Sequence, residues 1–432
     1  MGSVAVTASE AHGAIETVVR LESARLIAGL ARFTGDVGLA EELAQDALVT
    51  ALEQWPQSGV PRNPGAWLMT VAKRRAVDLF RRNQVLQGKY AEIGRTLEAE
   101  GDGDIAGADR ALTDPDEIDD DLLRLVFIAC HPVLGVQARV ALTLRLLGGL
   151  TTTEIARAFL VPEPTIAQRI VRAKKTLARA EVPFEVPGAD ERAARLSSVL
   201  EVVYLIFNEG YSATGGDDWM RPALCEDALR LGRVLAQLTP TDPEVHGLVA
   251  LMELQASRTA ARTGPGGEPV LLLQQDRSRW DRLLINRGLA ALARAEQLGG
   301  ARGRYALQAA LAACHARAVR AEDTDWERIC RLYAVLSEVT PSPVVELNRA
   351  VAVSMAYGPQ AGLDLVDALA AEPTLQRYHL LPSVRGDLLL KLGRADEARA
   401  EFERAAVLTG NARERELSAE RARAAQEHEQ PD

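Results

Sequence analysis

The stretch TTTEIARAFLVPEPTIAQRIVRAKKTL, residues Thr151–Leu177, decides the fold of the segment around it. Thr153 can cap a first helix, and Ile155 and Phe159 lie on the apolar face of that helix. The turn LVPEP follows, and it places Pro164 where the first turn of a helix tolerates proline. The pattern therefore predicts two short helices joined by a tight turn.

The second helix of this pair has one apolar face and one basic face. The apolar face repeats at intervals of four, three and four residues through Ile166, Ile170, Ala173 and Leu177. The polar side carries the residues that we expect to meet DNA, namely Thr165, Gln168, Arg169, Arg172, Lys174 and Lys175. Gln168 and Arg169 stand near the N-terminal end, where base edges are read, and the later cations would follow phosphates. This pattern is typical of a helix-turn-helix, although an amphipathic hairpin with a solvated basic face shows the same periodicity.

Length and composition place this motif in a large helical protein. The chain has 432 residues, more than one hydrophobic core usually supports, and aromatic residues make up only 4%. Abundant Ala, Leu, Arg and Glu predict an all-α fold. The four cysteines, Cys130, Cys225, Cys314 and Cys330, form no CxxC pair, so we expect neither a metal site nor disulfides. With no signal pattern and no run of about 18 apolar residues, we expect a cytoplasmic protein without a membrane span.

Charge is distributed in blocks along the chain, although the net charge is -10. Residues 62–82 carry six cations against one acid, and residues 151–180 carry six cations against two acids. Between them, residues 91–121 hold twelve acids and two arginines. Two basic islands separated by an acidic segment favour nucleic acid as a partner despite the negative total.

The first basic island is NPGAWLMTVAKRRAVDLFRR, residues Asn63–Arg82. We expect its core stripe to consist of Trp67, Leu68, Val71, Val77 and Phe80. A basic helix behind a Pro-bounded loop can hold an unstacked strand, with bases in the loop and phosphates on the cations. Trp67 by itself is more typical of a core anchor than of a base-stacking residue. The candidate strand-binding residues are Asn63, Lys73, Arg74, Arg75, Asp78, Arg81 and Arg82.

These two blocks, in this order, resemble regions 2 and 4 of the extracytoplasmic-function (ECF) sigma factors. AEELAQDALVTALEQW (Ala40–Trp55) is similar to region 2.2, which implies docking on the clamp of the polymerase β′ subunit through Glu42, Gln45 and Asp46. Asn63–Arg82 resembles regions 2.3 and 2.4, which melt and hold the −10 element. Thr151–Leu177 and the preceding LTLRLLGGL resemble region 4, which reads the −35 element beside the β flap. Many ECF factors carry Asn at the position of Arg74, so their −10 base preference does not transfer to this chain.

The resemblance implies four segments. We expect region 2 at 1–86, an acidic linker at 87–120, region 4 at 121–183 and a helical extension at 184–432. One stretch of the extension fits a tetratricopeptide repeat (TPR), with Gly386, Gly393, Ala398, Phe402 and Ala405 at the small and aromatic positions. VVYLIFNEGYSAT and LLLQQDRSRWD in the extension resemble the ECF subgroup usually numbered group 42. That subgroup is associated with small YCII-related (DGPF-type) proteins, which makes such a protein a candidate partner.

Two motifs of the extension mix charge with an aromatic residue. We consider them a candidate regulatory surface made of Asn208, Glu209, Tyr211, Asp276, Arg277, Arg279 and Trp280. The simpler alternative is that Glu209 or Asp276 pairs with a neighbouring arginine. The histidines are isolated and no catalytic, phosphate-loop or dinucleotide motif occurs, so we expect neither an enzyme nor a cofactor.

The sequence therefore predicts a sigma factor that directs core polymerase to promoters and whose activity the C-terminal extension modulates. The alternative is a one-component helix-turn-helix regulator whose helical repeats sense a ligand or protein. A segment like region 2 distinguishes the two hypotheses, because such a regulator has no use for a polymerase-docking helix followed by a basic melting helix.

Overall fold

The computed structural model describes residues 22–84, 115–159, 161–213 and 217–427. Helices and loops make up this part of the chain, with one isolated β-bridge between Thr263 and Pro269. The prediction of an all-α fold is therefore confirmed. The chain divides into two compact units, Met1–Val202 and Val203–Asp432. The four-segment division by residue number stays a prediction.

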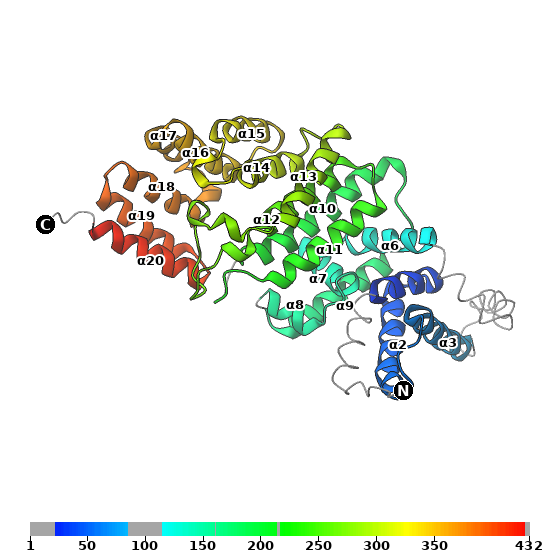
Figure 1. The fold of residues 1–432 in the computed structure, drawn as a ribbon. Helices are drawn as coiled ribbons and strands as arrows, with labels where there is room; N and C mark the ends of the chain where they lie inside the picture. Colours follow the sequence, from blue (N-terminus) through cyan, green and yellow to red (C-terminus); the bar gives the residue numbers. More distant parts are fainter. Residues whose placement is uncertain (1–21, 85–114, 160, 214–216, 428–432) are drawn as a thin grey trace, which may run out of the picture. The chain divides into compact units, whose positions relative to one another are not determined.

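The described part of the first unit starts with a helix over 22–34, and the unit ends within α10. Its other helices are α2 (Val37–Ser58), α3 (Pro64–Gln84), α6 (Pro115–Ala129), α7 (Val136–Leu146), α8 (Thr152–Ala158), α9 (Glu163–Arg179) and the first half of α10 (Ala189–Tyr211) (Figure 1).

The helix over 22–34, α2 and α3 form a small bundle. The Asp36 side chain caps α2 by accepting from the backbone N–H groups of Gly38 and Leu39 at 2.6 and 3.0 Å. The buried face of α3 consists of Leu68, Met69, Ala72 and Ala76, so it shares only Leu68 with the expected stripe. The other four expected residues, Trp67, Val71, Val77 and Phe80, are only partly buried. The two alanines of this face allow the last turns of α3 to approach the bundle closely.

The helix-turn-helix is formed by α8 and α9, which pack on α7. The cap of α8 is Thr151 rather than Thr153. The Thr151 hydroxyl accepts from the Glu154 N–H at 3.1 Å, and the Glu154 carboxylate accepts from the Thr151 N–H at 2.7 Å. This reciprocal capping box satisfies two backbone donors, so the helix begins one residue after Thr151. Pro164 lies in the first turn of α9, as predicted.

The first half of α10 is hydrogen-bonded to α6, to the turn after α6 and to α7. The Ser198 hydroxyl donates to the Cys130 carbonyl at 2.8 Å, and Arg195 donates to the Phe127 carbonyl at 3.3 Å. Ser198 also accepts from the buried Arg139 on α7. The start of α10 is therefore part of the first unit, although it lies beyond the expected end of region 4.

The second unit is an array of helices in which chain neighbours pack side by side (Figure 1). Its helices after α10 are α11 (Pro222–Leu238), α12 (Pro243–Ala256), α13 (Arg282–Gln297), α14 (Arg304–Arg317), α15 (Trp326–Val339), α16 (Pro343–Tyr357), α17 (Pro359–Leu369), α18 (Leu380–Lys391), α19 (Ala395–Leu408) and α20 (Ala412–Glu427). Five 3₁₀ turns lie between them: η1 (Thr259–Ala261), η2 (Leu272–Gln274), η3 (Arg277–Arg279), η4 (Ala321–Asp323) and η5 (Pro373–Leu375).

The α18–α19 hairpin contains the stretch that fits a tetratricopeptide repeat. Phe402 is fully buried, and a Cβ atom at Gly386 would lie 2.7 Å from its ring, so glycine is needed for this approach. Gly393 turns the chain between the helices with a φ of 76°. The close packing agrees with the repeat pattern, but assignment to that repeat family stays a prediction.

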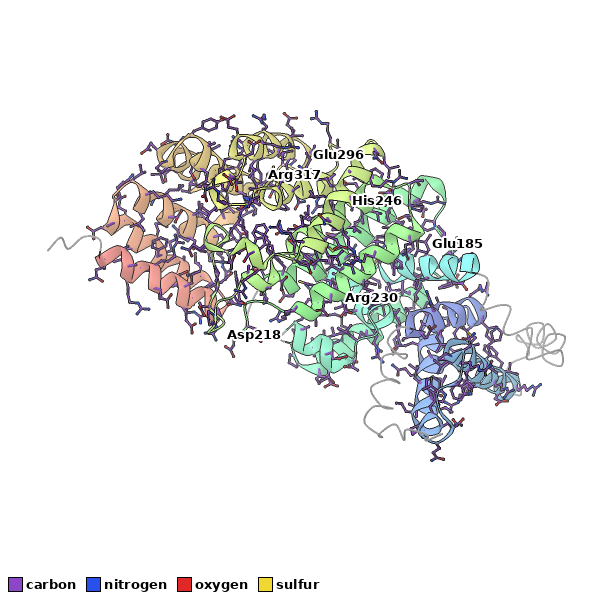
Figure 2. All side chains as sticks on the ribbon, in the orientation of Figure 1. Glu185, Asp218, Arg230, His246, Glu296 and Arg317 are labelled. Atoms are coloured by element: carbon purple, nitrogen blue, oxygen red, sulfur yellow. The ribbon has the colours of Figure 1, made fainter. Side chains whose placement is uncertain are left out.

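Within the described residues of the second unit, His246, His315 and His379 have structural surroundings. His246, labelled in Figure 2, shares a 3.0 Å hydrogen bond with the Pro240 carbonyl. His379 lies 3.0 Å from the Glu414 carboxylate. Burial and two nearby arginines lower the pKa of His315 to about 3. Among the described residues no cluster of potential ligands could hold a metal ion, and no helix has the length and apolar character that a membrane crossing requires.

Candidate nucleic-acid interface

The recognition helix α9 separates its two faces as the spacing predicts. Its buried residues are Ile166, Ile170, Ala173 and Leu177. The side chains of Thr165, Gln168, Arg172 and Lys175 are exposed. The helix therefore offers a polar surface that combines one amide, one hydroxyl and two cations, which suits a DNA groove.

Arg169 is partly buried and leans toward α7, where its guanidinium donates to the Gln137 side-chain oxygen at 3.3 Å. Gln137 is exposed in the first turn of α7 and was not among the predicted site residues. It lies 32 residues before Arg169. No local sequence signal could reveal the contact, because it depends on how α7 packs against α9.

Lys174 faces away from the exposed polar surface. Its ammonium group pairs with the Glu41 carboxylate of α2, and only 20% of its side chain is accessible. Arg145 of α7 also bonds this carboxylate, with 2.6 Å between Arg145 Nε and Glu41 Oε1. In this arrangement Lys174 does not reach a phosphate together with Arg172 and Lys175.

The basic helix α3 presents most of the predicted strand-binding residues. Arg74, Asp78 and Arg81 are exposed, whereas the Lys73 ammonium lies 5.6 Å from the Phe33 ring centroid. Arg82 lies in the last turn of α3, and its side chain is outside the described part of the structure.

Arg75 connects α3 to α2. Its guanidinium lies 2.9 Å from the Asp46 carboxylate and donates to the Thr50 hydroxyl at 2.9 Å. The structure thus brings together a residue predicted to bind the −10 strand and one predicted to bind polymerase. Both side chains keep substantial exposure, 41% for Arg75 and 62% for Asp46, so this ion pair contributes little to stability.

A pocket opens beside the loop that precedes α3. Asn63 caps α3 there by accepting from the Ala66 N–H at 3.1 Å. Three cations and two carboxylates lie in the wall, so the pocket is polar rather than purely basic. The lining residues are Glu22, Arg25, Gly29, Arg32, Asn63, Gly65, Ala66, Met69, Lys73 and Asp121.

One face of α2 carries the predicted docking residues. Glu42, Gln45 and Asp46 are exposed. Val49 and Leu52 follow at helical spacing, and they are 52% and 37% exposed. Exposed aliphatic residues beside carboxylates are typical of a protein-binding surface rather than of a DNA-binding one. Val49 and Leu52 follow Asp46 at intervals of three residues, so the sequence could have indicated that they share its face of α2. The sequence prediction did not include them.

Some of the residues expected to form a regulatory surface are buried in the protein, and others are exposed to solvent. Glu209, Arg277 and Trp280 are buried, so they do not lie on a surface. Glu209 pairs with Arg221, which is the simpler alternative raised by the sequence. Asp276 is exposed and caps η3, because it accepts from the Ser278 N–H at 2.9 Å.

The other candidate regulatory residues, Asn208, Tyr211 and Arg279, differ in exposure and in their contacts. Arg279 is exposed, and Asn208 is half-buried. The hydroxyl of Tyr211 accepts from Arg258, and the Arg262 guanidinium lies 3.4 Å from the Tyr211 ring centroid. Burial lowers the pKa of Arg262 to about 10. These contacts join the end of α10 to the loop after α12 and give Tyr211 a structural role.

The fold and its exposed basic helices define a helical DNA-binding protein, and comparison with known proteins agrees. Residues 18–85 match sigma-70 region 2, and residues 124–177 match sigma-70 region 4. Residues 195–296 match a family of unknown function, DUF6596. An uncharacterized protein of Rhizobium meliloti (strain 1021) is 45% identical over 385 residues, which cover 89% of each chain. No solved structure matches the chain.

The chain belongs to the ECF sigma factors that carry a C-terminal extension. Its two sigma regions support promoter-specific transcription through binding of core RNA polymerase and promoter DNA. The match to region 2 also disfavours the alternative of a one-component regulator.

Proposed function

We propose that α9 reads the −35 element, that α3 and its adjacent pocket hold the −10 strand, and that α2 docks on the polymerase clamp. The observation that carries the proposal is the division of α9 into a buried aliphatic face and an exposed face with Thr165, Gln168, Arg172 and Lys175. Arg169 reads a base edge beside them, and the outer cations position the helix on phosphates.

For the −10 strand, Arg74 and Arg81 follow the backbone of an unpaired strand along α3. The pocket beside Asn63 accepts an unstacked base, because it combines polar groups with the thioether of Met69. Docking on polymerase uses Glu42, Gln45 and Asp46, and the exposed Val49 and Leu52 add apolar area next to them.

The extension modulates the activity of the sigma regions in this proposal. The contact of the buried Arg262 with Tyr211 holds the end of α10 against the loop after α12. The exposed Asp276 and Arg279 remain available for a partner. A small YCII-related protein, implied by the group 42 resemblance, stays the candidate for that partner.

The test is run-off transcription with core polymerase, the full-length chain and a cognate promoter. We expect transcripts without another sigma factor. Arg74→Ala with Arg81→Ala should reduce the output on a double-stranded promoter more than on one whose −10 segment is already unpaired. A matched control is Arg302→Ala, which removes an exposed arginine from the loop before α14 in the second unit. Absence of transcripts with active core polymerase would refute the proposal.

A further inference from the structure

Three arginines and three aromatic residues of the second unit alternate in a single stack, which we call the arginine stack. Each guanidinium carbon lies 3.4 to 5.8 Å from the centroid of the ring beside it, within the range of a cation–π contact. In order along the stack, the members are Trp219, Arg262, Tyr211, Arg258, Trp280 and Arg277. They come from the end of α10, the loop before α11, and the turns η1 and η3 with their flanking residues, so folding of the second unit brings three cations together.

Among the described residues, no carboxylate lies within ion-pair distance of the three guanidinium groups of the arginine stack. The acids whose charge acts on the stack already have other partners. Glu322 and Asp323 lie 3.5 and 3.1 Å from Arg320, and Glu414 lies 3.0 Å from the His379 ring. The arginine stack therefore carries an excess of positive charge.

The pKa values of neighbouring groups reflect this excess. Burial and the charge of Arg258 lower the pKa of Arg277. Burial also lowers the pKa of His315 to about 3, with the charges of Arg258 and Arg277 as the next causes. The imidazole is therefore neutral near pH 7, and the same positive field would stabilise an anion placed beside these groups.

Two buried donors of the arginine stack have no acceptor in the described part of the chain. Trp280 is 4% exposed, and its indole Nε1 has no partner. Arg277 is 7% exposed, and its Nε has none, although its terminal nitrogens donate to the carbonyls of His315 and Ala318 and to the Thr324 hydroxyl. Buried donors usually have an acceptor, because leaving one unpaired costs about 1–3 kcal/mol.

Arg258, which lies between these donors and Tyr211, is half-buried, whereas the other two arginines of the stack are buried. Its Nη2 donates to the Tyr211 hydroxyl and to the Gln255 side-chain oxygen. Its Nε and Nη1 have no acceptor within the described ranges. A ligand in solution can therefore reach charged donors of the stack at Arg258.

We propose that the arginine stack binds a small oxyanion, the carboxylate or phosphate group of a small molecule. The N–H donors of a guanidinium group match the oxygen atoms of either group. The oxyanion accepts from Arg258, and a small displacement of this half-buried side chain opens the way to Arg277 Nε and the Trp280 indole. A purely structural role for the stack would leave both the charge and the two buried donors unexplained.

The test is thermal unfolding of the full-length chain with inorganic phosphate or succinate, at an ionic strength held constant with potassium chloride. A ligand of the native state raises the unfolding midpoint with concentration, so we expect a rise with at least one probe. The probe that acts more strongly distinguishes a phosphate from a carboxylate ligand. Arg258→Gln should weaken this binding at least tenfold, because it removes a charged donor. Arg294→Gln removes the same charge from an exposed site on α13 and should leave the binding unchanged.

Hydrogen exchange of the wild type keeps the test decisive if Arg258→Gln folds poorly. The active probe should slow exchange in peptides that contain Arg258 or Arg277 and leave peptides of α17 unchanged. No response of the wild type to either probe beyond that to chloride would overturn the site. An equal rise of the midpoint in the wild type, Arg258→Gln and Arg294→Gln would overturn it as well, because a general salt effect would then explain the rise.

An effect of the bound anion on transcription rests on the proposed function, whereas the site itself rests on the contacts of the second unit. Run-off transcription with the active probe, compared with chloride, should change the output of the wild type. Unchanged output with binding intact would contradict modulation through this site and leave the site itself standing.

Discussion

Arg169 is the residue whose role depends most directly on its neighbours. It is partly buried and held by Gln137, so its guanidinium reaches DNA in a restricted orientation. We expect Arg169→Ala to reduce discrimination at one −35 position by about 1–3 kcal/mol, as is typical of a lost base contact. Competition binding against single-base variants of the duplex measures this.

The matched control for Arg169 is Arg172→Ala, on the same helix but exposed. We expect this change to weaken all duplexes equally and to lower the salt dependence of binding, as for a lost phosphate contact. An equal loss on all sequences for Arg169→Ala would show that Arg169 contacts the backbone instead.

His315 gives the second unit a pH dependence. Its pKa is lowered to about 3 in the folded chain by burial and by the charges of Arg258 and Arg277, whereas the unfolded value is 6.5. The unfolded state therefore binds a proton below pH 6.5 that the folded state excludes down to about pH 3. Above pH 6.5 His315 is neutral in both states and does not lower the free energy of unfolding. Below pH 6.5 the free energy of unfolding falls, by up to about 1.4 kcal/mol per pH unit.

We expect the unfolding free energy of the wild type to fall by about 2 kcal/mol between pH 6.5 and pH 5 relative to that of His315→Gln. Urea unfolding of the two chains at each pH measures the difference. Parallel pH profiles would show that His315 is accessible to protons in the folded state.

At the scale of elements, the capping box of α8 decides where the helix-turn-helix begins. Thr151→Ala removes the hydroxyl that bonds the Glu154 N–H and should destabilise the first unit by about 1 kcal/mol. Thr153→Ala changes an exposed threonine inside α8 and should stay within about 0.5 kcal/mol of the wild type. Thermal unfolding of both variants measures this, and a larger effect at Thr153 would contradict the assignment of the cap.

At the scale of the whole molecule, α10 belongs to both compact units. A chain that ends at Glu181 loses the bonds of Arg195 and Ser198 to the Phe127 and Cys130 carbonyls. We expect it to be about 2–4 kcal/mol less stable than a chain that ends at Ser212, since each buried hydrogen bond contributes about 1 kcal/mol and its loss leaves polar groups unpaired. If circular dichroism gives the two truncated chains equal unfolding midpoints, region 4 ends near residue 183, as expected from the sequence.

The chain that ends at Ser212 also tests modulation by the extension. Run-off transcription by the chain that ends at Ser212, compared with the full-length chain, shows the direction of the effect. Unchanged output at equal concentration would contradict the proposed modulation.

Composition and residue spacing predicted the all-α class, the helix-turn-helix and the two faces of α9. These features depend on spacing within one helix or one turn, and Ile166, Ile170, Ala173 and Leu177 were buried as their periodicity predicted. Periodicity was less informative for α3, where Met69, Ala72 and Ala76 are buried and four of the five expected core residues are only partly buried.

Contacts between residues far apart in the sequence depend on how the helices pack, and no sequence pattern predicted them. Glu41 with Lys174, Arg169 with Gln137, and Ser198 with the Cys130 carbonyl join residues that are 32 to 133 positions apart. Burial also separated Glu209, Arg277 and Trp280 from the exposed residues of the same motifs. The physical reason is that burial and charge pairing depend on which helices pack together, and a local pattern carries no information about a partner so far along the chain.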